Sequence, residues 1–364
     1  MEEKGHRRRP WLGILLSLAV FAGAVWTAQR ILMPKYMGSV IEGNFTEEYY
    51  RDSTSHDLLI LGNCESYESI SPMTLWEEYG ITSFIRGNAN QLMPQSYYLL
   101  MDALKRETPK VVLINVQAMM AAEQDTEEYN RMVFDGMAWG WDKWEGIRAS
   151  AMEDEKMMEY IFPILRYHSR WSSLEKEDFV YSFREKPLTS FQGYYLRADV
   201  RPAGEFPAER RREDYTFPEE NYAYLDRIRQ ACEERGIALV LMKAPSLYPL
   251  WVPPYEEQIQ NYAEEHGLLY LNFLNLMEET GIDMSRDTYD EGLHMNVYGA
   301  EKVALYLGKV LEEMYGLEDH RDEADTAQYY EERLLAYEAE KERQTEEFSR
   351  LGYIPKFTEV FQEQ

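Results

Sequence analysis

Residues 57–62 read DLLILG and are followed by Asn63 and Cys64. Four consecutive apolar side chains that end at a glycine are typical of a short strand buried on both faces of a parallel sheet. A short helix is predicted next, over residues 71–79, because Ser71 can cap its N-terminus and a proline follows in the first turn. A buried strand followed so closely by a helix indicates an α/β protein.

The alternation of strand and helix continues along the chain. Further strands are predicted over residues 81–85, 111–115, 237–242 and 268–273. Helices are predicted over residues 94–106, 221–234, 255–266 and 299–314. Strands and helices that alternate at this pitch form a parallel sheet with right-handed crossovers. We therefore expect an α/β fold in which a five-stranded parallel sheet carries helices on both faces.

The remaining segments are expected to lie outside the sheet and its helices. The α/β domain is assigned to residues 56–117 and 218–316. The other assignments are a basic tail at 1–10, a transmembrane anchor at 11–30, a linker at 31–55, a mainly helical insertion at 118–217 and a charged helix at 317–364. Aromatic and leucine side chains in the last segment predict that this helix rests on another part of the protein.

The N-terminal apolar segment predicts that the protein is held at a membrane. Residues 11–29 carry no charge, and their number is close to the ~20 residues that span a bilayer as a helix. Three arginines at 7–9 precede them and favour a cytoplasmic N-terminus with the rest of the chain outside. A cleaved signal peptide is the alternative, because Ala22, Gly23 and Ala24 resemble a cleavage site. Either way, the main domain is expected outside the cytoplasmic membrane.

Composition excludes several classes of protein. The formal net charge of -27 would repel nucleic-acid phosphates, and no basic stripe beyond the N-terminus offsets it. Two cysteines, Cys64 and Cys232, are too few for a disulfide scaffold or a Cys-rich zinc site. We expect Cys232 in the core of a helix, although a single disulfide between the two is formally possible.

Candidate catalytic residues come from the loops that follow the strands, where functional groups collect in open parallel sheets. Acyl transfer needs a nucleophile, a base and a group that orients the base. Cys64 follows the first strand, and His294 precedes the last long helix of the α/β domain. Either Asp290 or Glu291 could orient His294. We prefer Asp290, because the glycine after Glu291 makes a turn with one extra residue easy.

These residues resemble the motifs of the SGNH/GDSL hydrolases. The likeness covers residues 57–117 and 237–312, and residues 294–302, HMNVYGAEK, carry its best match. It implies a flavodoxin-like three-layer sandwich and ester chemistry. The chain also resembles the membrane-anchored branch of that superfamily, whose members are found beside polysaccharide O-acetylation and teichoic-acid D-alanylation systems. This likeness implies a similar place for the present protein. The chain departs from the pattern in two ways: Cys64 stands where serine is usual, and Asp290 lies four residues before His294 instead of three.

Further residues are candidates for binding the oxyanion or the substrate. Backbone N–H groups of the Gly62-Asn63-Cys64 turn could face an oxyanion. Gly87 and Asn115 stand where the family places its other donors, although Asn115 could equally be a polar residue that ends a strand. Lys243 ends the fourth strand and could bind substrate or have a structural role.

The insertion contains two further groups that could serve the site. Arg166, His168 and Arg170 are predicted either to form an ion-pair cluster or to supply cations for an anionic polymer. The tryptophan-rich segment 139–144 could stack on sugar rings, but packing of the insertion is the more ordinary interpretation.

Two main hypotheses about function follow. The first is an extracytoplasmic esterase or O-acyltransferase that acts on a cell-envelope glycan through Cys64, His294 and Asp290. The second is a non-catalytic scaffold that binds a glycan or a multi-spanning membrane acyltransferase, and a third is an assembly subunit that works through its C-terminal helix. No cofactor is implied, and no metal, since no His/Asp/Glu group shows the sequence spacing of metal ligands.

Overall fold

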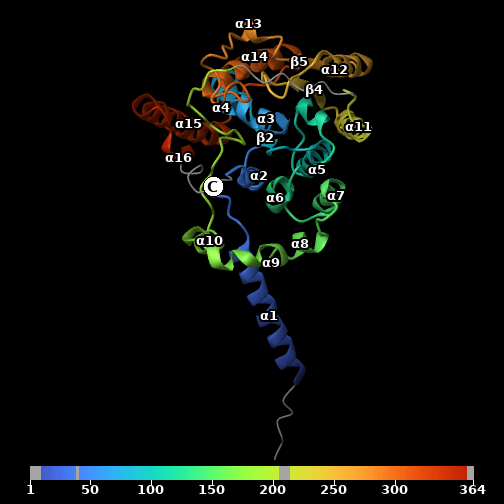
Figure 1. Ribbon diagram of the computed structural model, residues 1–364, viewed down its shortest axis with the longest axis vertical. Coiled ribbons are helices and arrows are strands. Elements are labelled where there is room, and N and C mark those ends of the chain that lie inside the picture. The colour runs from blue at the N-terminus through green and yellow to red at the C-terminus, as the bar shows by residue number, and fades with distance from the viewer. Residues whose placement is uncertain (1–9, 38–40, 205–213, 359–364) are drawn as a thin grey trace, which may run out of the picture. The chain divides into compact units, whose positions relative to one another are not determined.

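A computed structural model describes residues 10–37, 41–204 and 214–358 (Figure 1). The chain forms two compact units. The anchor unit comprises the N-terminal segment up to Met37 together with Asp154–Pro187, and the α/β unit comprises Gly38–Glu153 and Leu188–Gln364. The arginines at 7–9, on which the predicted membrane orientation depends, lie outside the described residues.

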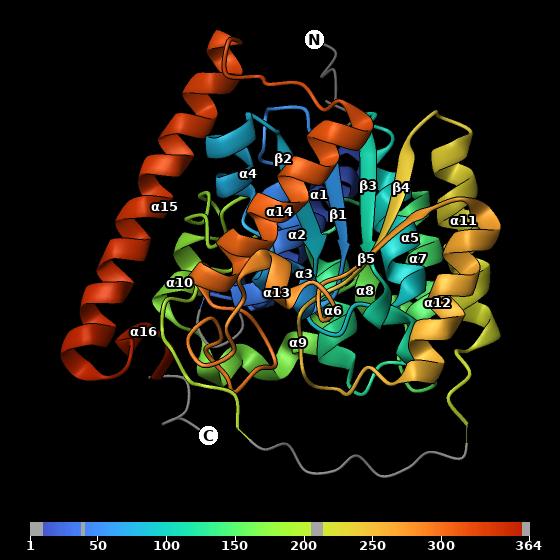
Figure 2. The ribbon, with the colours of Figure 1, turned by 90° about the horizontal axis from the view of Figure 1, so that it is seen from above.

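The predicted five-stranded parallel sheet is confirmed in the α/β unit (Figure 2). Its strands are β1 Leu58–Gly62, β2 Ser83–Gly87, β3 Val111–Asn115, β4 Ala238–Lys243 and β5 Leu269–Asn272. Their order across the sheet is β2-β1-β3-β4-β5, and every neighbouring pair is parallel. β1 lies second in this order, between β2 and β3, where the strand order reverses, so the loop after β1 opens at the switch point of the sheet edge, where functional groups usually gather.

Helices cover both faces of the sheet, so β1, β2 and β3 are buried along their whole length. One face packs against α3 Cys64–Ser69, α4 Pro72–Tyr79 and α14 Val297–Tyr315, and the other against α5 Met93–Ala103, α11 Glu219–Glu233 and α12 Pro253–His266. Successive strand residues alternate between the two cores: Ile60 belongs to the first and Leu61 to the second. This arrangement is consistent with a three-layer sandwich.

The charged C-terminal helix rests on the α/β unit, as its aromatic side chains predicted. It runs as α15 Ala324–Leu351 and is followed by α16 Pro355–Thr358. Tyr330 is buried and stacks on Trp76, with ring centroids 4.5 Å apart. Its hydroxyl oxygen accepts a hydrogen bond from the backbone N–H of Ser83 at 3.1 Å. Tyr337 is likewise buried, and its hydroxyl group bonds Ser71.

The segment assigned as a linker, residues 31–55, is not a connector throughout. Residues 41–49 form the short helices η1 Ile41–Asn44 and α2 Phe45–Tyr49. Phe45 is buried and makes an edge contact with Tyr67, with ring centroids 5.1 Å apart. Two aromatic side chains of this segment, Phe45 and Tyr49, are buried in the core, although the segment as a whole has a polar composition.

The insertion assigned to residues 118–217 is divided between the two units. Its helices α6 Glu127–Asp135 and α7 Trp141–Ser150 belong to the α/β unit. Helices α8 Met157–Ile161, α9 Ile164–Tyr167 and α10 Lys176–Val180 belong to the anchor unit. Residues 188–204 lie outside any helix, and Tyr194 and Leu196 among them are buried in the core of the α/β unit. The expectation of a single, mainly helical insertion is therefore corrected.

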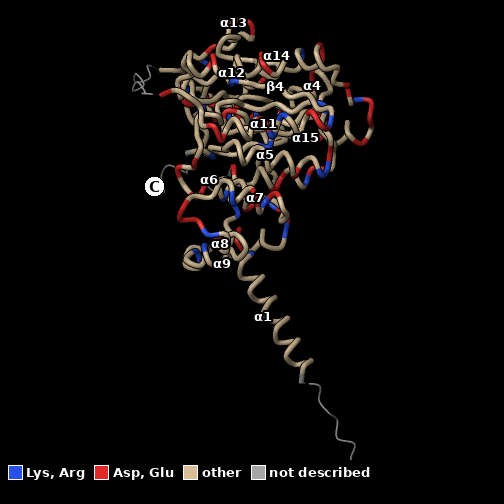
Figure 3. The backbone as a smooth tube through the Cα atoms, turned by 90° about the vertical axis from the view of Figure 1, so that its right-hand side faces the viewer, with Lys and Arg blue, Asp and Glu red and all other residues tan. Residues whose placement is uncertain are grey.

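The anchor unit contains one long apolar helix, α1 Pro10–Leu32. Arg30 is its only charged residue (Figure 3). Residues 11–32 of α1 are long and apolar enough to cross a membrane. This agrees with the predicted anchor, and the side of the membrane on which the α/β unit lies remains a prediction.

Candidate active site

A tight turn after β1 brings Cys64 to the first position of α3. Gly62 has φ +144°, and a Cβ atom there would come within 2.3 Å of Ser66 Oγ and 2.9 Å of Asn115 Cβ. Only glycine fits this close approach without displacing its neighbours. The side chain of Asn63 caps α3 by accepting a hydrogen bond from the backbone N–H of Glu65. Cys64 itself is partly exposed, as a nucleophile must be.

His294 is held by the loop that leads into α14. The side chain of Asn296 caps this helix, accepting hydrogen bonds from the backbone N–H groups of Tyr298 and Gly299. It also donates to two backbone carbonyl groups across the loop, at 2.8 and 3.1 Å. The motif asparagine therefore fixes the path of the chain two residues after His294.

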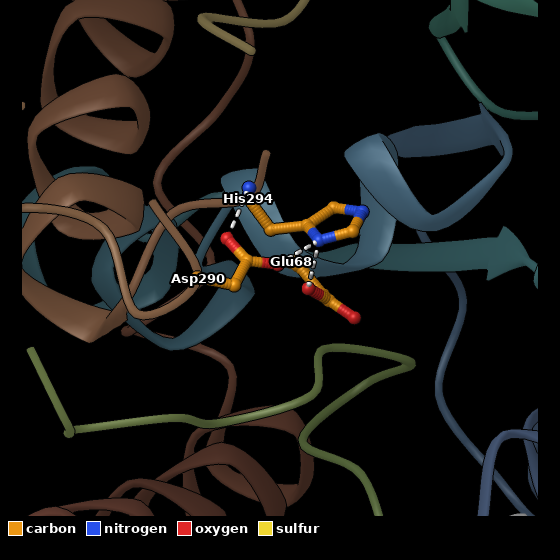
Figure 4. Close-up of side chains that lie close together, drawn as sticks. All are labelled: Glu68, Asp290 and His294. Atoms are coloured by element: carbon orange, nitrogen blue, oxygen red, sulfur yellow. Dashed lines mark hydrogen bonds and ion pairs between the residues drawn. The ribbon is translucent and has the colours of Figure 1, made fainter. Parts of the chain in front are cut away.

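Asp290 binds His294 through both of its carboxylate oxygens (Figure 4). Oδ2 lies 2.6 Å from the ring Nδ1 atom, and Oδ1 accepts a hydrogen bond of 2.8 Å from the backbone N–H of His294. Glu291 has φ +67°, and its carboxylate pairs with Arg201 at 2.8 Å in an exposed position. Of the two carboxylates left open by the sequence, the structure brings Asp290 to the imidazole.

A second carboxylate, Glu68, also approaches the imidazole. Its Oε2 atom lies 3.3 Å from His294 Nδ1 and accepts a hydrogen bond of 2.5 Å from the hydroxyl group of Tyr289. The Tyr289 ring lies nearly parallel to the His294 ring, with centroids 6.0 Å apart. Sequence reasoning missed Glu68 as a partner of His294. The available signal was its position one helical turn after Cys64, which places both side chains on one face of α3.

Cys64 is a further neighbour of His294, since its sulfur is one of the groups that raise the pKa of the imidazole. Nδ1 is already bonded to Asp290 and Glu68, and Figure 4 shows the other ring nitrogen pointing away from both carboxylates. Nε2 is therefore the ring nitrogen that is left for the thiol of Cys64. A thiol, an imidazole and carboxylates gathered in this way supply a nucleophile, a base and an orienting acid.

The surroundings of His294 favour its charged form. Burial by itself would lower the pKa of His294. The Glu68 carboxylate and the Cys64 sulfur outweigh burial, together with the hydrogen bond that His294 donates to Asp290. As a result the pKa of His294 is raised well above its usual value. At neutral pH a proton therefore resides on this imidazole.

The surroundings of Glu68, by contrast, favour its neutral form. Burial raises the pKa of Glu68 to about 7, despite the favourable charge of His294 and the hydrogen bond from Tyr289. Asp290 and Glu42 add to this increase because their negative charges lie nearby. Glu68 thus titrates in the neutral range, so the charge beside His294 depends on pH.

Asn115 and Lys243, two predicted binding residues, are engaged in a buried network. The ammonium group of Lys243 lies 2.9 Å from Glu65 Oε2, and the amide Nδ2 of Asn115 donates to the same oxygen at 3.1 Å. Asn115 also accepts a hydrogen bond from the backbone N–H of Gln117. Both residues are completely buried. The structure therefore places them beneath the turn after β1, where they support Glu65, and not on a surface that faces substrate.

The other predicted oxyanion residues also serve the turn. Gly87 is the sheet neighbour of Gly62, and a Cβ atom at Gly87 would lie 3.1 Å from the carbonyl oxygen of Gly62. The amide Nδ2 of Asn63 donates to Gln117. Two strands end side by side here, so position 87 requires a residue without a side chain. The Asn63 side chain makes its hydrogen bonds within the turn.

Arg166 and His168 belong to the anchor unit, whereas Cys64, Asp290 and His294 belong to the α/β unit. Arg170, in the same segment, pairs with Asp178 at 2.9 Å, as the ion-pair alternative predicted. Trp139 and Trp141 belong to the α/β unit and are exposed at its surface. Neither packs the insertion against the sheet, so the expectation of a packing role is not met by these two side chains.

Glu68, Asp290 and His294 form a group whose ligand atoms lie within 4.8 Å of one another. Sequence spacing indicated no such group, because its members come from segments more than 200 residues apart. A single His with two carboxylates is a donor set that zinc accepts. The 2.6 Å between His294 Nδ1 and Asp290 Oδ2 is nevertheless a hydrogen-bond distance, shorter than the ~3.3 Å between two ligands of a tetrahedral zinc with bonds of ~2.0 Å. The geometry fits a protonated imidazole better than a metal ion.

Known proteins supply no family for this chain. No family model matches it, and a search of curated proteins finds no match. What the site can do therefore follows from its own geometry, which sets a partly exposed thiol, a charged imidazole and a carboxylate in sequence.

Proposed function

We propose that this protein is an extracytoplasmic, SGNH/GDSL-type esterase or O-acyltransferase that acts on a cell-envelope glycan through a thiol nucleophile. The observation that carries the proposal is the position of His294, whose ring bonds Asp290 and lies close enough to Cys64 for the sulfur to raise the pKa of the imidazole. Cys64 and His294 are 230 positions apart in the sequence, and their meeting at one edge of the sheet supports a common role.

The chemistry begins with a proton shared between Cys64 and His294. The Cys64 sulfur, as the thiolate, attacks the carbonyl carbon of an acyl ester, and His294 donates its proton to the departing alcohol oxygen. An acyl thioester on Cys64 results. Water, or a glycan hydroxyl group, then gives its proton to His294 and attacks the thioester, which releases the acyl group and restores the thiol. Asp290 keeps the imidazole in place and stabilises its positive charge in both steps.

A place at the cell envelope is supported by α1 and by the arginines that precede it. A helix that can cross a membrane would hold the α/β unit at its surface. The arginines at 7–9 favour an orientation with the α/β unit outside. A C-terminal fusion to a reporter that is active only in the cytoplasm should therefore give no signal, and a strong signal would reverse the orientation.

A non-catalytic scaffold is the second candidate, and one observation favours it. Asn115 occupies a position at which the SGNH pattern places an oxyanion donor, but its amide is bound to Glu65 inside the protein. A site that lacks this donor would stabilise a tetrahedral intermediate less well. In that case the surface around Cys64 would bind a glycan or a multi-spanning membrane acyltransferase without turnover.

Replacement of Cys64 separates the two candidates. The full-length protein in lipid nanodiscs would be assayed with a p-nitrophenyl ester and with an acyl thioester. We expect Cys64→Ala to abolish hydrolysis and Cys64→Ser to retain part of it. Cys232→Ala is the matched control, because Cys232 is buried in α11 and should not affect the rate. Equal rates for the unchanged protein and Cys64→Ala would leave only the scaffold.

A further inference from the structure

Residues 154–187 of the anchor unit, which we call the collar, lie beside the C-terminal end of α1 (Figure 1). The collar contains α8, α9, α10 and the 3-10 helix η3 His168–Ser173. Of these elements, α9, η3 and α10 contact α1 directly. Nothing in the proposed acyl chemistry uses this segment.

Hydrogen bonds fasten the collar to the last turn of α1. The guanidinium group of Arg170 donates to the carbonyl oxygen of Leu32 at 2.5 Å, and Ser182 Oγ donates to that of Arg30 at 2.8 Å. Arg30 Nε donates in return to the carbonyl oxygen of Ser182 at 2.6 Å. These bonds satisfy carbonyl groups that a helix end leaves without partners, and the positive charge of Arg170 suits the negative end of the helix. The collar and the end of α1 therefore form one structure.

The length of α1 places this structure at the surface of a bilayer. Its 23 residues extend about 34 Å, against a hydrocarbon core of about 30 Å. Trp11 and Trp26 lie near the two ends of the helix, as tryptophans do at membrane interfaces. The guanidinium group of Arg30 lies over the Trp26 ring at 5.0 Å, at the boundary between apolar and charged sequence. If α1 spans the bilayer, the collar lies at the level of the lipid headgroups.

The collar exposes an unusual share of large apolar side chains. Six of its 34 residues are of this kind: Met158, Phe162, Leu165, Trp171, Phe179 and Phe183. The described part of the α/β unit has only nine, although it is several times longer. Met158 lies on α8 and Leu165 on α9, and Phe162 lies between the two helices. Aromatic and apolar groups concentrated in one segment mark a surface for another apolar phase.

The charge of the collar also suits a membrane. It has six Lys and Arg residues and seven Asp and Glu residues, a formal charge of -1, whereas the whole chain carries -27. Anionic lipids would repel most of this protein but not the collar. A nearly neutral segment with exposed aromatic groups can enter the interface through its apolar side chains without depending on anionic lipid.

We infer that the collar lies in the interfacial layer of the same bilayer that α1 spans, with Trp171, Phe179 and Phe183 inserted among the lipids. The inference rests on α1 as a membrane span and is independent of the acyl chemistry. It gives the protein a second membrane contact, fixed to the end of α1. It also gives Arg170 a role different from that of a cation near the active site, since Arg170 holds the collar to the anchor.

An environment-sensitive fluorescent label reports this position. In the full-length chain with Cys64→Ser and Cys232→Ala, a single cysteine is introduced by Trp171→Cys or by Leu335→Cys and labelled with a nitrobenzoxadiazole group. Trp171 and Leu335 are matched, since their side chains are 77% and 73% exposed, and Leu335 lies on α15 of the α/β unit. The proteins are placed one copy to a nanodisc, which excludes contacts between copies. Headgroup-proximal doxyl lipids should quench the label at 171 about twofold or more relative to that at 335, because interfacial segments sit about 5–10 Å into the boundary.

Two results would overturn the inference. One is equal quenching at the two positions. The other is blue-shifted emission at 171 without quenching by lipid, which would mean that protein covers the collar. Phe179→Asp with Phe183→Asp should reduce quenching at 171 but leave the protein in the membrane after alkaline carbonate extraction, because α1 is unchanged. Extraction of the unchanged protein by carbonate would remove the span on which the inference rests, whatever the outcome of the esterase assay.

Discussion

Asp290 holds His294 at two points, bonding its ring Nδ1 atom at 2.6 Å and its backbone N–H at 2.8 Å. The loop of five residues from Asp290 to His294 is therefore closed by two contacts with a single carboxylate. The imidazole cannot rotate without breaking the shorter of these bonds, so the direction of its other ring nitrogen is fixed. This relationship makes the roles of individual side chains testable.

Loss of the Asp290 charge should impair the reaction, while loss of the Glu291 charge should not. Asp290→Asn keeps the size of the side chain but removes the acceptor that favours the charged imidazole. We expect the rate of ester hydrolysis to fall on the order of 10²-fold or more, as for other orienting carboxylates. Glu291→Gln is the control, because Glu291 pairs with the exposed Arg201, and its rate should stay near that of the unchanged protein. Equal losses in both variants would contradict the assignment of Asp290.

Replacement of Glu68 should change the pH dependence of the site. Glu68 is the largest of the influences that raise the pKa of His294, so Glu68→Gln should lower that pKa. If the protonated imidazole is required, the alkaline limb of activity should move to lower pH by about 1–3 units, the usual effect of a nearby opposite charge. The pH profiles of ester hydrolysis and of Cys64 alkylation by iodoacetamide measure this shift. An alkaline limb at the same pH in both proteins would show that Glu68 does not act on the proton of His294.

The ion pair between Glu65 and Lys243 should matter for stability more than for substrate binding. Lys243→Met leaves the Glu65 carboxylate buried without its cation and should destabilise the protein by about 3–5 kcal/mol. The double variant with Glu65→Gln removes the uncompensated charge and should recover much of this loss. Thermal unfolding of the full-length protein in mild detergent gives the comparison. A raised KM with unchanged stability in Lys243→Met would instead support the substrate-binding role.

A second buried histidine predicts loss of stability at alkaline pH. His56 lies between Glu107 and Asp52, with Nδ1 3.0 Å from Glu107 Oε2 and Nε2 3.3 Å from Asp52 Oδ2. Burial opposes its charge, but the hydrogen bonds that the ring donates to both carboxylates raise the pKa of His56 to about 9. The raised pKa means that the stabilisation is fully present below the unfolded pKa near 6.5 and disappears as pH rises through 9, a change on the order of 3 kcal/mol.

His56→Gln removes this titration and provides the test. The difference in unfolding temperature between the unchanged protein and His56→Gln should be large at pH 6 and should shrink toward pH 9.5. Taking the difference cancels the contribution of His294, whose raised pKa acts in the same direction. A difference that stays constant across this range would show that His56 is neutral in the folded protein.

The sequence alone was enough to predict the sheet. Apolar runs such as residues 58–61 and 111–114 are too short for helices and too continuous for strands with one wet face, so a buried parallel sheet was the remaining solution. The turn at Gly62 and the asparagine cap at Asn296 are likewise local features, set by backbone conformation within a few residues. The segment at 41–49 escaped prediction because two aromatic side chains in a polar context give no periodic signal.

The residues of the site were identified partly by the local sequence and partly by the tertiary structure. Local sequence identified Cys64, His294 and Asp290 as candidates, because each lies at a strand end or beside a helix cap. Only the tertiary structure decided which other charges surround them. It brought Glu68 to the imidazole, and it enclosed Lys243 and Asn115 around Glu65 beneath the turn. It also divided the insertion, so that Arg166 and His168 belong to the anchor unit. Contacts between distant segments arise from the packing of layers, and a single sequence carries no local pattern that records them.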